Sequence, residues 1–546
     1  MFGGGRVAVV VLAAAAVLTG CSAAPEPSAA PLGDQVRIEQ GELLGTTDGD
    51  VLRYQGIPYA EPPVGELRWE PPQPPPSWTG TRNATSPGSR CAQLTAAPAT
   101  PLAAPLAAAG STSEDCLTLD VTVPAGTTPR SQLPVLVWIH GGGFNAGAGS
   151  DVDPRRLVRA GPLVVVTVNY RLGIFGFFGL PGLSGSGTFG ILDQQAALHW
   201  VRRNIAAFGG NPGSVTLAGE SAGADSVCAQ LASPGAVGLF HRVILQSGGC
   251  STANIVDVIR PGSGPGGDTW KPLPLVEAAG EAVASQFGCP DRGRTPAPTV
   301  ACLRAVSTDR LVAGAGVYWS PATGTPALPR RPSDIVVDRD LRAVPVLAGI
   351  TRDEGTLFSA VFFDQAGAPL TAAGFRTLLT AAAGTRAQAA MLTYPLTGRS
   401  PGRVWSDVIT DRGYACTMLA TQRILGPRAP LYAYEFADPT APSPFVTLPP
   451  HLATGVTHGA EMPYLFDLVP TQPALTPEQQ ALAKEMVAAW ARFAATGNPN
   501  GGGGPVWPRW AGAGSVLTIT GAGHGTEVRP AAEFAAAHNC GLWDLS

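Results

Sequence analysis

Six short apolar runs constrain the fold of this chain more than any other feature of its sequence. They occupy residues 134–140, 163–170, 214–219, 242–248, 344–350 and 430–436. Runs that are this short and this continuously apolar are typical of strands buried on both faces, as in a parallel sheet. Helical stretches separate several of the runs. We therefore predict an α/β fold with a large, mostly parallel central sheet and helices on both of its faces.

Two stretches, one between the second and third runs and one after the last run, carry clear helical signals. Apolar residues recur at helical spacing within 193–210, and that stretch ends at a Gly-Gly pair. The stretch 476–497 begins with a threonine that can cap a helix and ends with a glycine. We interpret the segments 251–275 and 360–412 as irregular insertions. Insertions in such folds tend to lie over the strand ends, where ligands bind.

Length and composition are those of a globular chain with one large core. The chain has 546 residues, of which 45% are apolar and 14% are charged. Large α/β folds often reach this length as a single domain. The net charge is −4 and the arginines are scattered, so we expect no nucleic-acid partner. The sequence contains no CxxC or histidine-rich cluster, so we expect no metal site.

The first 20 residues have the pattern of a secretion signal. Arg6 precedes an apolar run over 7–18, which is shorter than the roughly 20 residues that a transmembrane helix needs. The ending LTGC resembles a bacterial lipobox, in which Cys21 would be acylated; an ordinary cleaved signal is the alternative. Residues 21–34 would then be a lipid-anchored flexible tether, and 35–546 the folded domain. We expect an exported protein, held at the outer face of the cell membrane as a lipoprotein or secreted.

Export changes the interpretation of the other cysteines, because disulfides persist outside the cytoplasm. These cysteines are Cys91, Cys116, Cys228, Cys250, Cys289, Cys302, Cys416 and Cys540. Their even number fits a framework of disulfides, although the spacing alone leaves the pairing open.

The stretch Gly219-Glu220-Ser221-Ala222-Gly223 lies between an expected strand and an expected helix. Small residues around a serine allow a tight strand-to-helix turn that holds the hydroxyl outward, as in a nucleophile elbow. The following helix would direct its free N–H groups toward any anion formed beside Ser221. The five-residue pattern alone is common by chance in a chain rich in glycine and alanine. Its strand-before and helix-after context makes the prediction of a nucleophilic serine specific.

A second glycine-rich stretch, HGGGF at 140–144, can supply the hydrogen-bond donors that such a serine needs. Consecutive glycines expose backbone N–H groups without side chains in the way. Gly142 and Gly143, together with the N–H of Ala222, can form a three-donor oxyanion hole. A plain flexible turn is one alternative. A phosphate-binding loop is another, and it fails because no Lys-Ser or Lys-Thr pair follows the glycines.

A base and an orienting acid are expected after the serine, in the chain order Ser, Asp or Glu, His. Asp353 and Glu354 follow the run at 344–350, and either can serve as the acid. The histidines further along are His451, His458, His524 and His538. Position favours His458, which lies in a turn-like context after the run at 430–436. A lone histidine is nevertheless more often structural than catalytic.

Taken together, these residues make the chain resemble the type-B carboxylesterase and cholinesterase family of α/β-hydrolases. The likeness follows one order through nearly the whole mature chain. Matching stretches are 54–69, 114–121, 140–144, 168–177, 192–224, 349–355 and 458–466. The resemblance implies an α/β-hydrolase fold, with insertions over the active site, and a serine carboxylic-ester hydrolase.

The resemblance also assigns roles that the spacing leaves open. It implies Glu354 as the acid and His458 as the base that activates Ser221. Glu220 and Glu461 match glutamates of a buried polar network in the family, and would tune the base rather than carry the chemistry. The implied reaction is acyl transfer through an acyl-enzyme, with an ester as the small-molecule substrate and no metal or cofactor.

Other matches imply structural roles. The resemblance implies the ion pairs Arg68–Glu114 and Arg171–Asp193. It implies disulfides that pair Cys91 with Cys116, Cys416 with Cys540 and, by a poorer match, Cys289 with Cys302. Cys228 and Cys250 are left over, and our hypothesis is a fourth disulfide between them that braces the helix after Ser221.

Departures from the family narrow the substrate. The segment 92–115 has no aromatic residue, so cation–π recognition of a choline group there is not expected. We predict hydrolysis of short to medium acyl esters. A lipase with a flap in 92–115 is the alternative, and a non-catalytic adhesion protein is a further one. The intact set of Ser221, Glu354 and His458 argues against the adhesion protein.

Overall fold

The computed structural model describes most of the chain. The described residues are 1–5, 8, 30–94, 110–251, 259, 269–289, 295–314, 319–337, 343–453, 455–470, 472–521 and 526–543. Cys21, most of the expected signal and tether, and residues 95–109 of the loop at 92–115 lie outside this description.

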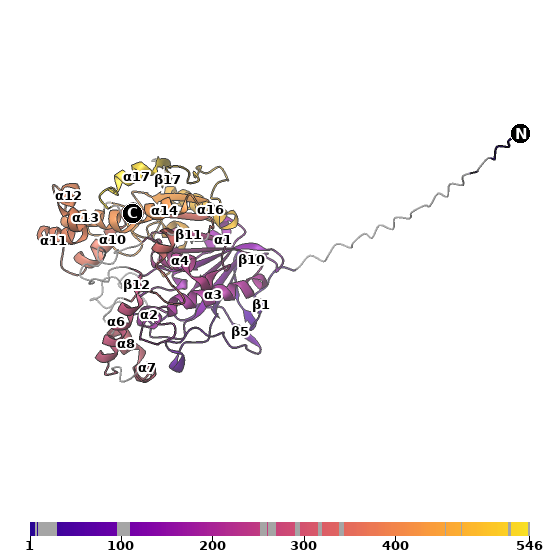
Figure 1. Cartoon of the computed structure of the whole chain (residues 1–546), viewed down its shortest axis with the longest axis horizontal. Coiled ribbons are helices and arrows are strands. Elements are labelled where there is room, and N and C mark those ends of the chain that lie inside the picture. The colour runs from indigo at the N-terminus through magenta and orange to yellow at the C-terminus, as the bar shows by residue number, and fades with distance from the viewer. Residues whose placement is uncertain are drawn as a thin grey trace.

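The described residues contain a central sheet of eleven strands (Figure 1). In spatial order the strands are β18 (Glu527–Pro530), β17 (Ser515–Ile519), β15 (Leu431–Phe436), β14 (Val346–Thr351), β11 (Arg242–Gln246), β10 (Gly210–Glu220), β7 (Leu133–Ile139), β9 (Val164–Val168), β6 (Thr118–Pro124), β4 (Val51–Pro58) and β3 (Thr46–Asp48). Neighbouring strands from β17 to β9 are parallel, and the pairs at either edge are antiparallel. The six apolar runs are β7, β9, β10, β11, β14 and β15, so the predicted parallel sheet is confirmed.

Short strands outside the central sheet form three small sheets. They are β1 (Gln35–Ile38), β2 (Gly41–Leu44) and β5 (Thr81–Asn83); β12 (Lys271–Pro272) and β13 (Ala322–Thr323); and β8 (Val152–Asp153) and β16 (Asp467–Leu468). The pairing of β8 with β16 joins segments more than 300 residues apart, because Asp467 lies opposite Asp153.

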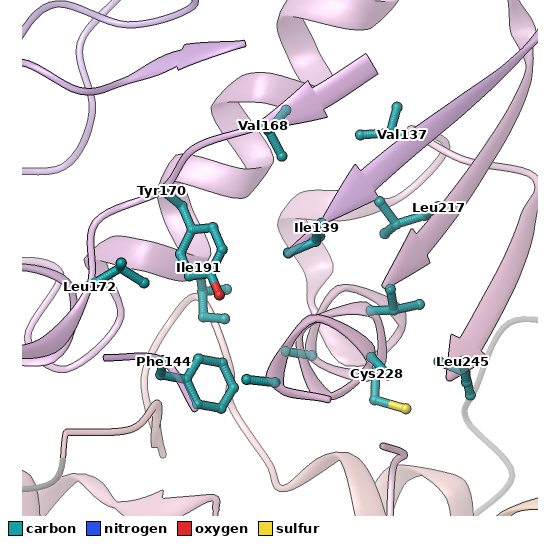
Figure 2. Close-up of a cluster of buried hydrophobic side chains, with 14 of the residues drawn as sticks. Val137, Ile139, Phe144, Val168, Tyr170, Leu172, Ile191, Leu217, Cys228 and Leu245 are labelled. Atoms are coloured by element: carbon teal, nitrogen blue, oxygen red, sulfur yellow. The ribbon is translucent and has the colours of Figure 1, made fainter. Parts of the chain in front are cut away.

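Helices cover both faces of the central sheet because successive side chains of a strand point to opposite sides. On β7, Val137 belongs to one core cluster and the next residue, Trp138, to the other. The first face carries α3 (Phe189–Asn204) and α4 (Ala222–Ala232), and the second carries α1 (Arg155–Ala160) and α16 (Pro477–Thr496). Figure 2 shows side chains of the first face gathered between the strands and the helix that carries Cys228.

The two predicted helices are present and end as their signals indicate. The stretch at 193–210 forms most of α3 and a short 3-10 turn that stops at Gly209, which has a left-handed φ of 76°. The stretch at 476–497 is α16, where the Thr476 side chain accepts the N–H of Gln479. Gly497 ends that helix with φ 78°.

The segment 360–412 is largely helical, so its interpretation as irregular is wrong. It contains α11 (Ala372–Ala383), α12 (Ala387–Thr393) and α13 (Pro401–Val408), which lie together at the left of Figure 1. Alanine and glycine dilute the apolar pattern there, yet Phe375 and Leu379, one turn apart, are buried. Phe375 packs edge-on against Trp405 of α13 at 6.4 Å between ring centres. Most of the other expected insertion, 251–275, lies outside the described residues.

The described residues contain nine further α-helices. They are α2 (Gly173–Phe177), α6 (Leu273–Gln286), α7 (Ala297–Arg304), α8 (Thr308–Gly314), α9 (Pro332–Val337), α10 (Gly355–Ser359), α14 (Cys416–Leu425), α15 (Met462–Leu465) and α17 (Ala531–Ala537). None of the helices in the described part of the chain is long and apolar enough to cross a membrane.

Four disulfides join the described cysteines. The pairs are Cys91–Cys116, Cys228–Cys250, Cys289–Cys302 and Cys416–Cys540. Three of them are the pairs that the resemblance implies, and the remaining one is the pair that we hypothesised. It joins α4 to the segment after β11. Disulfides in this number indicate a protein that folds outside the reducing cytoplasm.

Candidate active site

The sequence GESAG forms the sharp turn between β10 and α4. β10 ends at Glu220 and α4 begins at Ala222, so Ser221 alone joins the strand to the helix. Its backbone has φ 55° and ψ −127°, which is strained for a residue with a Cβ. The Ser221 N–H donates to the carbonyl of Gln246 at 2.8 Å and holds the turn against β11. This local geometry is that of a nucleophile elbow.

Gly223 allows the first turn of α4 to approach the end of β7. A Cβ at Gly223 would overlap the carbonyl oxygen of Ile139. The glycine loop begins directly after β7, and a Cβ on Gly141 would lie 3.1 Å from the Cβ of Ser221. The loop and the serine are therefore immediate neighbours.

The carbonyl groups of Gly141 and Gly142 both have partners in the glycine loop. His140 Nδ1 lies 2.8 Å from the carbonyl oxygen of Gly141, and the Gly142 carbonyl accepts the N–H groups of Asn145 and Ala146 at 3.1 Å each. The N–H and C=O of a trans peptide point in opposite directions. Each held carbonyl therefore fixes the N–H of the next residue, namely the N–H of Gly142 and that of Gly143.

His458 and Glu354 meet in a buried position at the carboxyl end of the sheet. The His458 Nδ1 lies 2.5 Å from Glu354 Oε2, and Glu354 is fully buried between β14 and α10. The second oxygen of Glu354 accepts the N–H of Thr351 at 2.9 Å. Since Nδ1 faces the carboxylate, the other ring nitrogen, Nε2, is the atom available for proton transfer. That nitrogen lies 3.1 Å from Oε1 of Glu220.

Asp353 fastens the loop that carries His458. Its N–H donates to the carbonyl of Val456 at 3.0 Å, and one of its side-chain oxygens accepts the Val456 N–H at 2.9 Å. Arg403 holds the other oxygen at 2.7 Å. Of the two acids that the sequence left open, Glu354 contacts the histidine and Asp353 ties the two loops together. Sequence reasoning missed this second role, although the neighbouring acidic residues were a signal for it.

Two further glutamates surround the histidine. Glu461 is fully buried, and its Oε1 accepts the side-chain amide of Gln246 at 3.1 Å. Trp490 in turn donates to the oxygen of that amide at 3.0 Å. Burial and repulsion between neighbouring carboxylates raise the pKa of both Glu220 and Glu461. Burial alone would lower the pKa of His458, but Glu220 and Glu354 outweigh it and raise that pKa.

Two aromatic rings that stack on each other pack against the histidine. The ring centres of Phe358 and Tyr414 lie 5.0 and 5.3 Å from that of His458. Phe358 lies on α10 and Tyr414 on a π-helical turn at Ile409–Ala415. Neither residue stood out in the sequence, because both belong to segments that had no recognised motif. They shield the ion pair between His458 and Glu354 from water, which strengthens it.

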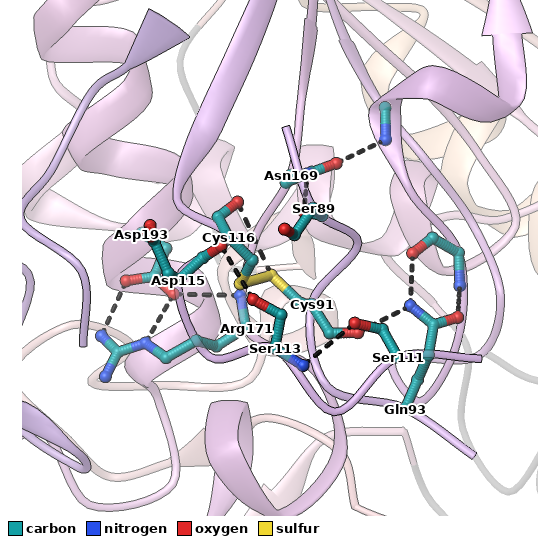
Figure 3. The surroundings of a disulfide bond; sticks show 12 residues. Ser89, Cys91, Gln93, Ser111, Ser113, Asp115, Cys116, Asn169, Arg171 and Asp193 are labelled. Carbon is teal, nitrogen blue, oxygen red and sulfur yellow. Dashed lines mark hydrogen bonds and ion pairs between the residues drawn. A yellow bond between two sulfur atoms is a disulfide. The ribbon is translucent and has the colours of Figure 1, made fainter. Parts of the chain in front are cut away.

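The other histidines that the sequence offered lie elsewhere. His451 faces Asp364 at 3.1 Å, His538 lies between two carboxylates near the C-terminus, and His524 is outside the described residues. The structure also contains the ion pairs Arg68–Glu114 at 2.6 Å and Arg171–Asp193 at 2.7 Å, the second of which is drawn in Figure 3. Within the described part of the chain, no group of three or more His, Cys, Asp or Glu residues could hold a metal ion.

Comparison with known proteins assigns the chain to a family. The model of the Carboxylesterase family matches residues 33–543. A cocaine esterase of Oryctolagus cuniculus is 34% identical over 502 residues, covering 87% of this chain and 88% of the relative. A para-nitrobenzyl esterase of Bacillus subtilis (strain 168) is 33% identical over 482 residues, covering 85% of this chain and 90% of the relative.

Solved structures agree with this assignment. A PNB esterase structure superposes with a TM-score of 0.74 at 30% identity, covering 92% of this chain and 99% of that one. A thermophilic PNB esterase gives the same TM-score at 29% identity. The α/β-hydrolase fold expected from the resemblance is thus confirmed. The chain belongs to the carboxylesterase family and is a carboxylic-ester hydrolase.

Proposed function

We propose that the protein hydrolyses short to medium acyl esters through a Ser221–His458–Glu354 triad and an acyl-enzyme. The observation that carries the proposal is the 2.5 Å contact between His458 and Glu354 at the sheet end where Ser221 forms the elbow. Membership of the carboxylesterase family supports the reaction class.

Acylation begins when Ser221 Oγ attacks the ester carbonyl. The O–H bond of the serine breaks, its proton passes to His458 Nε2, and the carbonyl oxygen becomes an anion. The N–H groups of Gly142, Gly143 and Ala222 stabilise that anion, each contributing about 10²–10³-fold to turnover. The protonated histidine then gives its proton to the leaving alcohol, and the acyl group stays on the serine.

Deacylation repeats these steps with water as the nucleophile. His458 accepts a proton from water, and the hydroxide attacks the acyl carbon. The second oxyanion collapses, the proton returns to Ser221 Oγ, and the carboxylic acid leaves. Throughout, Glu354 keeps the imidazole oriented and stabilises its positive form. Glu220 and Glu461 tune the proton affinity of the histidine without taking part in bond changes.

The proposal of uncharged esters rather than choline esters rests on the segment 92–115. This segment has no aromatic residue to bind a quaternary ammonium group. Some relatives are named for ester substrates, among them the para-nitrobenzyl and cocaine esterases, and we infer that this chain also acts on small uncharged esters. The alternative lipase flap would involve residues 95–109, which lie outside the described residues.

The decisive experiment is hydrolysis of p-nitrophenyl esters from acetate to palmitate by the disulfide-bonded protein, beside Ser221→Ala. Activity that peaks at short chains and disappears in the variant supports the proposal. A peak at long chains would favour the lipase. Equal, measurable rates for the wild type and the variant would exclude Ser221 as the nucleophile. No activity in the correctly folded, disulfide-bonded wild type would return the adhesion protein to consideration.

We also propose that residues 1–20 are removed as a signal peptide, that Cys21 carries a lipid and that residues 21–34 tether the domain at 35–546. The pattern LTGC and the disulfides support export. Mass spectrometry of the mature N-terminus tests the proposal, since a diacylated Cys21 is expected. Cys21→Ser should release the protein into the medium, and retention of that variant on the membrane would contradict the anchor.

A further inference from the structure

The side-chain amide of Gln93 joins the first disulfide to the glycine loop. Gln93 is 3% exposed, and its Nε2 donates to the carbonyls of Cys91 and Gly147, both at 2.9 Å. Its Oε1 accepts the N–H of Gly147 at 3.0 Å. Figure 3 shows the amide of Gln93 with these contacts beside the Cys91–Cys116 disulfide. One buried side chain therefore holds both polar backbone groups of Gly147.

Gly147 closes the glycine loop on itself. It has a φ of 109°, and a Cβ at this position would overlap Nδ1 of His140 and lie 2.8 Å from the carbonyl oxygen of Gly141. The Cα of Gly147 thus packs directly against the contact between the His140 ring and the Gly141 carbonyl. Any displacement of Gly147 would disturb that contact, because protein interiors leave no free space around such atoms.

The contact beside Gly147 fixes a proposed donor of the oxyanion hole. The Gly141 carbonyl faces His140 Nδ1, so the N–H of Gly142 in the same peptide points the opposite way. The next peptide is held through Ala146, which is the neighbour of Gly147 in the chain and donates to the Gly142 carbonyl. Gly147, which Gln93 holds, therefore lies next to two groups that orient the proposed donors: the His140 ring beside the Gly141 carbonyl and the N–H of Ala146 on the Gly142 carbonyl.

The other side of Gln93 leads into the loop at 92–115. Its backbone exchanges two hydrogen bonds with Ser111, with the Ser111 carbonyl accepting at 2.9 Å and the Gln93 carbonyl accepting at 3.3 Å. The described ends of this loop thus meet at the residue whose amide holds the glycine loop. Gln93 is the direct connection between the two loops.

We propose that Gln93 is a positioning residue for the oxyanion hole, which it aligns by clamping Gly147 from the first disulfide loop. The inference rests on the proposed function, because it assigns Gly142 and Gly143 as donors to the oxyanion. Gln93 acts through the backbone of the glycine loop and has no direct contact with the substrate in this scheme.

The test replaces Gln93 by Met, which has a similar shape and no amide. We expect kcat for p-nitrophenyl acetate to fall about 10- to 100-fold. Misaligned donors stabilise the oxyanion less, and the oxyanion forms mainly in the transition state. KM should change less than about twofold, because the ground state makes little use of the hole. The affinity for a trifluoromethyl ketone, whose hemiketal places an anion in the hole, should fall by the same factor as kcat/KM.

The matched control is Gln479→Met. Gln479 is also a buried amide, but it lies in the first turn of α16 and its Nε2 donates to the carbonyl of Thr440 at 2.8 Å. Its variant should keep kcat within about twofold of the wild type. Rates are expressed per serine titrated with a fluorophosphonate, so that misfolded molecules do not contribute. If Gln93→Met fails to fold, Gln93→Glu keeps the acceptor for the Gly147 N–H and removes the donor, and we expect its kcat to fall in the same way.

Two results would overturn the inference. One is a kcat for the Gln93 variant equal to that of the Gln479 variant. The other is an unchanged affinity for the trifluoromethyl ketone in spite of a lower kcat, which would assign the loss to another step. Failure of the proposed function would look different, because the wild type and Ser221→Ala would then hydrolyse the ester at the same rate.

Discussion

Two buried histidines in this molecule have almost the same immediate surroundings. His458 has Glu354 at Nδ1, 2.5 Å away, and Glu220 at Nε2, 3.1 Å away. His538 has Asp411 at Nδ1 and Glu435 at Nε2, each at 2.9 Å. In both cases burial would lower the pKa of the imidazole, and the two carboxylates outweigh burial and raise it. A buried histidine between two carboxylates is therefore not by itself a catalytic site.

The surroundings of His538 are closed by further hydrogen bonds. The second oxygen of Asp411 accepts the hydroxyl of Tyr394 at 2.7 Å and the side-chain amide of Asn539 at 2.9 Å. Two residues after His538, Cys540 forms a disulfide with Cys416. These contacts tie the C-terminal segment to the body of the protein.

His458 differs from His538 because one of its two carboxylate partners, Glu220, is followed directly by a serine. Glu220 is followed by Ser221 in a strained turn, and the glycine loop lies against that serine. In the proposed mechanism His458 exchanges its proton with this serine, whereas His538 links Asp411 to Glu435 in the interior. A neighbouring nucleophile and oxyanion donors, rather than the two carboxylates, therefore distinguish the proposed base His458 from the structural histidine His538.

The largest effect that tests this comparison is expected for His458→Gln. This variant should lose roughly 10⁴-fold or more in kcat for p-nitrophenyl acetate, because no group remains to take the serine proton. The measurement is steady-state hydrolysis, with near-UV circular dichroism to establish that the variant is folded. A folded variant that kept more than about one hundredth of the wild-type kcat would contradict the assignment of the base.

The disulfides beside the two regions should differ in what they stabilise. Cys416 and Cys540 are 124 residues apart, and Cys228 and Cys250 only 22. Loop-closure entropy predicts a loss of about 4.7 kcal/mol of unfolding free energy for a loop of about 100 residues and about 3 kcal/mol for a much shorter one.

Denaturant unfolding of the two double Cys→Ala variants measures this difference. The variant without Cys228 and Cys250 should also lose activity per folded molecule, because that bond braces α4 behind Ser221. Equal losses of stability, or lost activity in the C-terminal variant instead, would contradict the expectation.

His538→Gln should lower stability while leaving turnover alone. Removing the positive charge strands Asp411 and Glu435 in the interior, which costs about 3 kcal/mol or more. Because the folded-state pKa of His538 is raised, its stabilisation is fully present below the unfolded pKa of about 6.5 and is lost as the pH rises through the folded-state value.

The stability gap between the wild type and His538→Gln should therefore be largest at acidic pH and shrink in alkaline solution. Chemical denaturation at several pH values provides the measurement, and kcat should stay within about twofold. A gap that widened toward alkaline pH would mean that the histidine is neutral in the folded protein.

How much of this could be predicted depends on whether the signal is local. The parallel strands were predictable because runs such as 163–170 are continuously apolar, and α16 because Thr476 and Gly497 mark its ends. The helices within 360–412 were not predictable, since in alanine-rich segments the buried and exposed positions differ little in hydrophobicity. The short strands before residue 125 were not predicted either, because no continuous apolar run marks them.

The features of the candidate site also divide into those with a local sequence signal and those that depend on distant residues. The turn at Ser221 is local and could be read directly from GESAG. The contact between Glu354 and His458 joins residues 104 apart, and the residues alone left Asp353 and three other histidines open until the family resemblance was considered. The clamp of Gln93 on Gly147 spans 54 residues, and nothing in either segment indicated it. Long-range pairs of this kind depend on how the strands are ordered, which local patterns do not specify.

The smallest effect in the comparison concerns the charge of Glu220. A negative charge there favours the protonated form of His458, so Glu220→Gln should lower the pKa of the base. In a plot of kcat/KM against pH, the acid limb should then move to lower pH by about one pH unit. Glu435→Gln, which makes the same change beside His538, is the matched control and should leave that limb in place.

Each outcome of this last measurement bears on the difference between the two histidines. A limb that moves down only in the Glu220 variant would show that the carboxylate beside the elbow sets the proton affinity of the base. An unmoved limb would contradict the prediction and would mean that Glu220 keeps its own proton, as its raised pKa permits. The charge of His458 would then depend on Glu354 and, at longer range, on Glu461. The likeness to His538, which has a carboxylate at each ring nitrogen, would be one of geometry only.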